Sequence, residues 1–159
     1  EYGPAKIWPH ENYAALVSRI AAETGRSIVV IGSEGDRPSG ARIIEEAGIE
    51  GHNLAGMGDV EGLLCVLRGS SLVIGNDSGP VHLSAAMGRP TVIIFGSTSP
   101  EWTVPKGRAT AIVRAGLDCS PCFKRECPHG EARCMLDIDP ELVFDTAHRL
   151  LREESSKNA

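Results

Sequence analysis

Residues that could form an anion-binding site follow one another in the middle of the chain. Asp77, Ser78 and Gly79 follow the apolar run 72–74, and His82 comes about one helical turn later. Hydroxyl, imidazole and backbone N–H groups donate hydrogen bonds to phosphate, and glycine lets a ligand approach the backbone closely. This pattern predicts an anion site, which we interpret as the site for the diphosphate of a nucleotide sugar. The alternative is that Asp77 or Ser78 only caps a helix.

A strand–helix–strand unit must position these groups. The run 72–74 ends in glycine and polar residues, Pro80 opens a helix of small residues that ends at Gly88, and a second apolar run covers 91–95. In such a unit ligands bind beyond the carboxyl ends of the strands, where the helix presents free N–H groups and the positive end of its dipole.

A second predicted strand is also followed by residues with carboxylate side chains. The β-branched run 27–31 predicts a strand that is buried on both faces, and the turn 32–36 follows it. Carboxylates in this position often accept hydrogen bonds from ribose hydroxyls, so Asp36 is the predicted ribose ligand, with Glu34 as its rival. A solvated acid at the start of a helix is the alternative for either residue.

Lys6 lies in a loop rich in glycine and proline, ahead of Trp8. An ammonium group there could reach a phosphate and offset the charge that develops on a leaving diphosphate. The alternative is that Lys6 is only solvated, as a single lysine in a loop usually is.

The segment 117–135 has no periodicity and predicts an excursion from the fold that carries four cysteines: Cys119, Cys122, Cys127 and Cys134. Four thiolates can bind a metal ion tetrahedrally, but the spacing is not one of the standard zinc sets, even with His129 among them. Reduced thiols or local disulfides are the favoured interpretation.

The pair Asp137 and Asp139 has the form of an Asp-x-Asp metal motif. Asp139 also precedes Pro140 and Glu141, which is the composition of a helix start, with a capping residue, a proline and an acid in the first turn. We therefore expect a structural role and no metal.

The elements together indicate an α/β fold. Helices predicted over 10–24, 38–47, 59–68 and 139–151 alternate with short apolar strands, which is typical of a doubly wound parallel sheet. We expect one Rossmann-like domain over 1–159. In the third helix Val60 and Cys65 are expected to face the core, and in the last helix Leu142 is expected to do so.

Composition excludes several classes of protein. A content of 42% hydrophobic and 23% charged residues is ordinary for a globular domain, and a net charge of −5 gives no general attraction for nucleic acid. No apolar run approaches the roughly 18 residues of a membrane span. The motifs of dinucleotide-binding dehydrogenases, P-loop enzymes and α/β-hydrolases are absent from the sequence.

Several segments carry a resemblance to a known family. They are Tyr2-Gly3-Pro4-Ala5-Lys6-Ile7-Trp8-Pro9, Gly32-Ser33 with Asp36, Asn53-Leu54-Ala55-Gly56, Asn76-Asp77-Ser78-Gly79-Pro80-Val81-His82-Leu83 and Phe95-Gly96-Ser97-Thr98-Ser99-Pro100. They are similar to segments of glycosyltransferase family 9, in particular of its type II ADP-heptose:lipopolysaccharide heptosyltransferases. The segment from Cys119 to Met135 recurs in a subset of these enzymes.

The resemblance implies the C-terminal half of a GT-B glycosyltransferase, in which two Rossmann-like domains face each other across a cleft. It implies inverting transfer of heptose from ADP-heptose to the lipopolysaccharide inner core, in the cytoplasm or peripherally at the inner membrane, without a metal or another cofactor. Carried over by position, Lys6 contacts the donor phosphates as the catalytic residue, and Asp36 contacts the ribose. The diphosphate side of the donor is held by Asp77, Ser78, Gly79 and His82, and the backbone of 56–58 borders the adenine.

The family's general base is an acid of the N-terminal domain, which this sequence does not include. The chain opens on a loop-like stretch, 1–6. We therefore expect that the first strand of the domain is missing and that the sequence is a piece of a longer protein. The chain alone should then bind ADP or an ADP-sugar weakly without turnover.

Three alternatives stay open. The first is a GT-B enzyme that uses another nucleotide sugar, such as a UDP-sugar transferase or a non-hydrolysing epimerase. The second is a non-catalytic nucleotide-binding module. The third is a metal-dependent regulatory role for the cysteine excursion.

Overall fold

The computed structural model describes residues 3–104 and 109–157. Tyr2, the first residue of the family-like segment 2–9, lies outside the described residues, as do 105–107 of the predicted loop 97–107 and the last two residues of the predicted polar tail. The described residues form two compact units. The larger unit consists of the N-terminal stretch through Trp8 together with Val66 onward, and the smaller unit is Pro9–Cys65.

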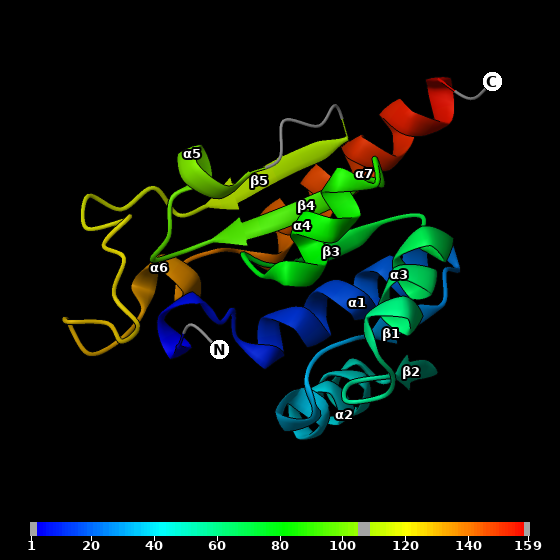
Figure 1. The fold of residues 1–159 in the computed structure, drawn as a ribbon, viewed down its shortest axis with the longest axis horizontal. Coiled ribbons are helices and arrows are strands. Elements are labelled where there is room, and N and C mark those ends of the chain that lie inside the picture. Colours follow the sequence, from blue (N-terminus) through cyan, green and yellow to red (C-terminus); the bar gives the residue numbers. More distant parts are fainter. Residues whose placement is uncertain (1–2, 105–108, 158–159) are drawn as a thin grey trace. The chain divides into compact units, whose positions relative to one another are not determined.

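The larger unit is built on a three-stranded parallel sheet in the order β3 (Val73–Asn76), β4 (Thr91–Phe95) and β5 (Thr110–Arg114), shown in Figure 1. The register aligns Ile74 with Val92 and Ile93 with Ile112. The central strand β4 is buried along its whole length, which explains why it reads as an unbroken apolar run.

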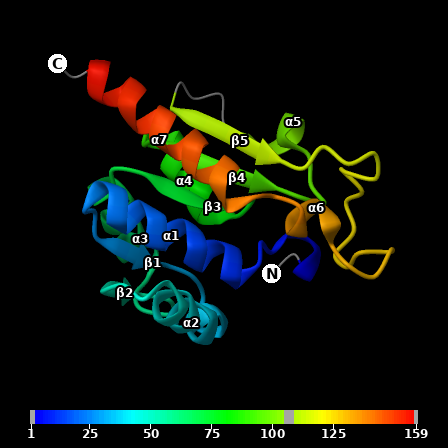
Figure 2. The same ribbon diagram turned by 180° about the vertical axis from the view of Figure 1, so that it is seen from behind.

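Helices cover both faces of this sheet. Helix α4 (Gly79–Ala86) connects β3 to β4 and lies in front of the sheet in Figure 1, whereas α7 (Pro140–Lys157) lies in front when the same ribbon is seen from behind in Figure 2. Helix α7 buries Val143, Ala147 and Leu150. Leu142 was expected on this face but is 50% exposed, because it lies about 100° around the helix from Val143.

Short helices complete the larger unit. A 3-10 helix, η1 (Pro4–Lys6), carries the predicted lysine. Helix α5 (Pro100–Thr103) lies inside the predicted loop 97–107, where the Ser99 hydroxyl accepts a hydrogen bond from the Glu101 N–H at 3.3 Å and caps it. Helix α6 (Arg133–Leu136) ends the cysteine excursion.

The smaller unit pairs β1 (Ile28–Val30) with β2 (Gly51–Asn53) in parallel. Helices α1 (His10–Thr24) and α2 (Arg37–Ala47) pack on each other, and a 3-10 helix, η2 (Glu34–Asp36), follows β1. The strand 27–31 was expected to be buried on both faces, and this is wrong, since Val29 is 41% exposed. A two-stranded sheet leaves every strand at an edge.

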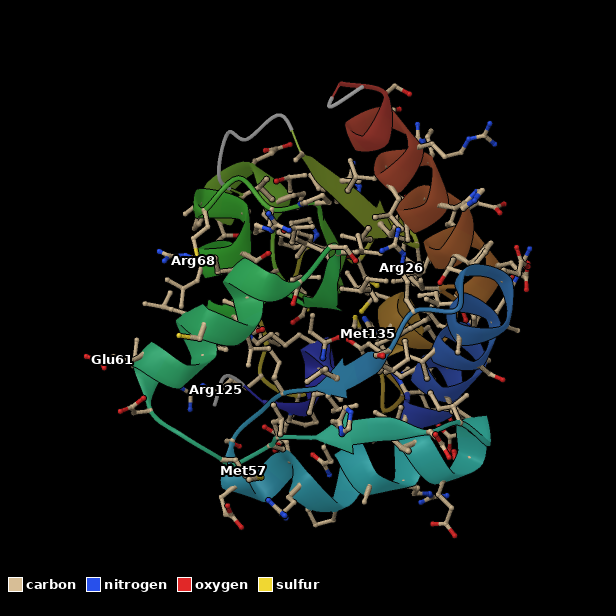
Figure 3. All side chains as sticks on the ribbon, turned by 90° about the vertical axis from the view of Figure 1, so that its right-hand side faces the viewer. Arg26, Met57, Glu61, Arg68, Arg125 and Met135 are labelled. Atoms are coloured by element: carbon tan, nitrogen blue, oxygen red, sulfur yellow. The ribbon has the colours of Figure 1, made fainter. Side chains whose placement is uncertain are left out.

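Helix α3 (Val60–Gly69) follows β2 in the chain. Its fully buried residue is Leu67, so the predicted inward positions of Val60 and Cys65 are both wrong: Val60 is 65% exposed and Cys65 is exposed. Cys65 lies two positions from Leu67, about 200° around the helix. In Figure 3 Glu61 and Arg68 also point away from this helix, whereas Met135 of α6 lies among other side chains.

The predicted α/β architecture of alternating helices and parallel strands is confirmed, with the described strands in two sheets. The expectation of one domain over 1–159 stays a prediction. Every helix in the described ranges 3–104 and 109–157 is too short or too polar to cross a membrane.

Candidate functional site

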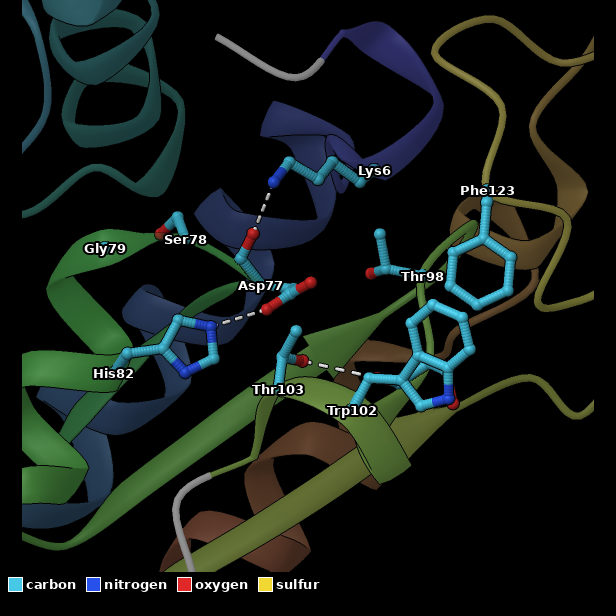
Figure 4. Close-up of a pocket in the computed structure, with 10 residues that line it drawn as sticks. Lys6, Asp77, Ser78, Gly79, His82, Thr98, Trp102, Thr103 and Phe123 are labelled. Carbon is cyan, nitrogen blue, oxygen red and sulfur yellow. Dashed lines mark hydrogen bonds and ion pairs between the residues drawn. The ribbon is translucent and has the colours of Figure 1, made fainter.

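A pocket of about 390 Å³ opens in the larger unit where β3 and β4 end (Figure 4). Its wall contains every residue that was predicted to contact the diphosphate, together with residues that the sequence did not single out as ligands. Asp36 and the backbone of 56–58, which were predicted to contact the nucleoside, are not part of this wall. The lining residues are Lys6, Asp77, Ser78, Gly79, His82, Thr98, Ser99, Trp102, Thr103 and Phe123.

Asp77 contacts both basic side chains of this site, Lys6 and His82. It is only 5% exposed, and its carboxylate Oδ1 lies 2.6 Å from His82 Nε2. Its backbone carbonyl accepts a hydrogen bond of 2.6 Å from Lys6 Nζ. Because the carboxylate can only accept, it keeps the proton of a neutral His82 ring on Nε2. The structure thus brings Lys6 and His82 to the same residue, although 71 positions separate Lys6 from Asp77.

The first turn of α4 forms the adjoining wall. Ser78 occupies the cap position, but its side chain makes no capping hydrogen bond, so the capping alternative is wrong for this residue. A Cβ atom added to Gly79 would meet no heavy atom within 4 Å. The first N–H groups of a helix lack intrahelical acceptors, and the helix dipole is positive at this end. The arrangement suits a ligand that carries negative charge.

Sequence reasoning missed the opposite wall as a ligand-binding surface. Trp102 and Phe123 stack with ring centroids 4.8 Å apart and planes at 27°. Thr98 is 8% exposed, and its hydroxyl has no hydrogen-bond partner within the described part of the chain. Thr98 is the third residue after β4, whereas Asp77 directly follows β3. A polar residue soon after the end of a strand is the signal that could have found Thr98. No sequence pattern connects Trp102 with Phe123.

Asp36 lies in the smaller unit, in the turn after β1. Its Oδ2 accepts hydrogen bonds from the Ser33 N–H at 2.8 Å and the Ser33 hydroxyl at 2.6 Å, which forms a capping box. The Gly56 N–H donates to the Gly32 carbonyl at 3.0 Å, and a Cβ on Gly56 would overlap Glu34 Oε2. The two predicted nucleoside-binding segments therefore lie side by side. The ribose role of Asp36 stays a prediction, with Glu34 nearer to the glycine-containing loop.

The cysteine excursion is attached to the strand exit that lines the pocket. The Ser120 hydroxyl donates to the Gly96 carbonyl at 2.6 Å, and the Phe123 N–H donates to the Ser97 carbonyl at 2.7 Å. The Ala5 N–H donates to the Arg125 carbonyl at 3.0 Å, beside the catalytic candidate Lys6. The excursion therefore supports both the loop after β4 and the loop that carries the lysine.

The cysteines of the excursion are free thiols. Burial raises the pKa of the Cys134 thiol above its ordinary value of 9.0, and the neighbouring Cys122, Cys119 and Cys127 raise this pKa further. Among the described residues no three His, Cys, Asp or Glu side chains converge in a way that could hold a metal ion. The state of the four cysteines of the excursion stays a prediction.

The Asp-x-Asp pair has the predicted structural role. Asp139 Oδ1 accepts a hydrogen bond from the Glu141 N–H at 2.9 Å at the start of α7. Asp137 forms an ion pair with Arg133 at 2.8 Å. Both carboxylates are used locally.

Comparison with known proteins assigns this chain to a class. The profile of glycosyltransferase family 9 (heptosyltransferase) matches residues 1–133. This is more than half of the chain, so the chain belongs to glycosyltransferase family 9. Lipopolysaccharide heptosyltransferase 2 of Salmonella typhimurium is 33% identical over 158 residues, which are 97% of this chain and 45% of that protein.

Solved structures agree. The E. coli ADP-heptose lipopolysaccharide heptosyltransferase II matches with a TM-score of 0.81 at 30% identity, over 98% of this chain and 45% of that one. A family 9 glycosyltransferase of Veillonella parvula matches with a TM-score of 0.83 at 25% identity, over 94% of this chain and 43% of that one. The predicted fold class, the C-terminal half of a GT-B glycosyltransferase, is confirmed. The chain spans about half the length of these relatives.

Proposed function

We propose that this chain is the donor-binding half of an inverting heptosyltransferase that transfers heptose from ADP-heptose to the lipopolysaccharide inner core. The observation that carries the proposal is the contact of Lys6 and His82 with Asp77 at the start of α4. The family membership and the relatives named heptosyltransferase 2 support the sugar and the acceptor. The name of the E. coli relative supports ADP-heptose as the donor. We place the enzyme in the cytoplasm, peripherally at the inner membrane where its lipid acceptor lies.

In the proposed reaction, an acceptor hydroxyl attacks the anomeric carbon of the heptose from the face opposite the diphosphate. A new carbon–oxygen bond forms, the bond to the diphosphate breaks, and ADP leaves with the bonding electrons. The charge that develops on the diphosphate is offset by the Lys6 ammonium, the N-terminal N–H groups of α4 and the His82 ring. The acceptor proton goes to a base that this chain does not supply.

The test is a nucleotide panel on the 159-residue chain, by thermal shift and by calorimetry. We expect ADP and ADP-heptose to raise the melting temperature, and UDP at equal concentration to have a smaller effect, because a ligand that binds only the folded state stabilises it in proportion to its affinity. A larger shift with UDP would favour the UDP-sugar alternative, and no shift with any nucleotide would overturn the proposal.

A non-catalytic nucleotide-binding module is the second candidate. It predicts that substitution of Lys6, Asp77 or His82 in the full-length protein leaves lipopolysaccharide synthesis in cells unchanged. Loss of the heptose-containing core on a gel of extracted lipopolysaccharide would exclude this candidate.

A further inference from the structure

Part of the pocket wall consists of a hydroxyl and two aromatic side chains that phosphate binding does not require. Besides its anion-binding side, the pocket is lined by Thr98, Trp102 and Phe123. Figure 4 shows the Trp102 and Phe123 rings together on one side of the pocket, with His82 on the other. A ligand that fills this pocket must therefore carry both a charged group and a group with apolar faces.

The Thr98 side chain indicates a missing hydrogen-bond partner. It is 8% exposed, it lines the pocket, and its hydroxyl lacks a partner among the residues that the structure describes. Burial of an unpaired hydroxyl is unfavourable, so such groups in folded proteins are generally satisfied by protein, water or ligand. A ligand hydroxyl is a matching partner.

The aromatic pair indicates an apolar contact. Trp102 is 77% exposed and Phe123 is 43% exposed, although the two rings stack on each other. Phe123 has φ of 55°, a left-handed conformation that is unfavourable for a bulky residue, and its N–H is fixed to the Ser97 carbonyl at 2.7 Å. Strain of this kind persists where the surroundings hold a residue in place, and it concentrates at ligand sites.

We propose that Thr98, Trp102 and Phe123 form the subsite for the glycosyl group of the donor. Sugar rings have an apolar face of C–H groups, which suits the electron-rich face of an aromatic ring, and hydroxyls at their edge, which suit Thr98. The sugar is bonded directly to the diphosphate, so it occupies the wall next to the anion-binding side of the same pocket. This inference rests on the proposed function, because that function supplies the sugar diphosphate.

Tryptophan fluorescence tests the contact in the unmodified chain. The sequence contains two tryptophans; Trp8 is 1% exposed, so a soluble quencher such as acrylamide acts mainly on Trp102. We expect saturating ADP-heptose to lower the quenching constant about twofold or more, since a stacked sugar covers a large part of the ring. ADP, which lacks the sugar, should leave the constant nearly unchanged.

Two substitutions measured by calorimetry extend the test. Trp102→Ala and Thr98→Val should each weaken ADP-heptose binding about tenfold and change ADP binding by less than about twofold. Trp102→Phe, which keeps an aromatic face, should recover most of the affinity. The matched control is Leu142→Ala, which truncates a half-exposed apolar residue of α7 that is not among the pocket-lining residues, and it should change neither ligand's binding.

The outcomes separate this inference from the proposed function. Failure of the wild-type chain to bind ADP and ADP-heptose would overturn both. Normal ADP binding with equal quenching in the two complexes, or equal losses for the two ligands in Trp102→Ala, would overturn the subsite alone. Protection of Trp102 by a heptose-containing acceptor but not by ADP-heptose would also overturn it and would assign the wall to the acceptor.

Discussion

Asp77 connects the two basic side chains of the pocket through different atoms. Its carbonyl accepts from Lys6, and its carboxylate lies against His82. A single residue therefore fixes the position of a charged group from a distant loop and of a ring from the following helix. The geometry explains why the predicted phosphate ligands meet in the folded chain.

Removal of the lysine charge should weaken donor binding without unfolding the protein. Lys6→Met keeps the aliphatic stem and loses the ammonium group, and a hydrogen bond to a charged group contributes about 1.5–3 kcal/mol. We expect ADP affinity to fall about 10- to 100-fold in calorimetry. Lys124→Met, in the exposed part of the cysteine excursion, is the control. Equal affinities of the wild type and Lys6→Met would contradict a role for Lys6 at the phosphates.

Gly79 offers a test that separates binding from folding. A Cβ at this position meets no protein atom within 4 Å, yet the residue lines the pocket. Gly79→Ala should leave the melting temperature equal or slightly higher, since alanine is favoured over glycine in helices by up to about 1 kcal/mol. ADP affinity should fall about tenfold, because the methyl group occupies ligand space. A variant that binds ADP normally would place the phosphates elsewhere.

At the scale of elements, the sequence predicted the helix ends that are marked by residues close to them in the chain. Pro80 and Gly88 mark α4, and Asp139 caps α7 as expected. Helix faces were harder to predict: Val60, Cys65 and Leu142 are all exposed where an inward position was expected. Apolar residues at the edge of a stripe are buried only if a neighbouring element covers them, and periodicity does not report which elements are neighbours.

The free cysteines of the chain should react in the order of their exposure. Cys65 and Cys119 are exposed, whereas Cys134 is buried with a raised pKa, so less of it is thiolate. Timed alkylation with iodoacetamide, followed by peptide mass spectrometry, should modify Cys65 and Cys119 first and Cys134 last. Rapid modification of Cys134 in the folded chain would contradict its described burial, and uniform protection of all four excursion cysteines would favour a metal cluster.

The same thiol links stability to pH. The folded-state pKa of Cys134 lies above the ordinary 9.0, so above pH 9.0 the unfolded chain releases this proton while the folded chain retains it. The contribution is fully present below pH 9.0 and is lost as the pH rises further, so the free energy of unfolding falls. Urea unfolding below and above pH 9.0 measures this, and Cys134→Ala should show a smaller decrease. An equal decrease in both proteins would assign the effect to other groups.

At the scale of the whole molecule, we propose that the chain binds the donor and does not itself supply the base for the reaction. It spans 45% of the Salmonella relative. We expect the purified 159-residue chain to bind ADP-heptose and to transfer no heptose to a lipopolysaccharide acceptor, measured as ADP release in a coupled assay. Release at a rate above that of a Lys6→Met control would show that the chain supplies its own base.

The sequence predicted the proposed phosphate ligands more completely than the rest of the pocket wall. Asp77, Ser78, Gly79 and His82 lie within one strand–helix turn, so local pattern alone brings them together. Trp102 and Phe123 meet only because the cysteine excursion folds back onto the loop that follows β4. No local sequence pattern predicts this contact. Asp36 lies in the smaller unit, outside the pocket wall, and its role stays a prediction.

The glycines of the larger unit should differ in how well they tolerate substitution. A side chain at Gly75 would press on Val81, and one at Gly96 would overlap Met135, whereas Gly79 faces open space. In a randomised library selected only for folded protein, positions 75 and 96 should remain glycine while position 79 varies. Selection for growth that requires the enzyme should then restore glycine at position 79, which distinguishes a residue retained for its ligand from residues retained for packing.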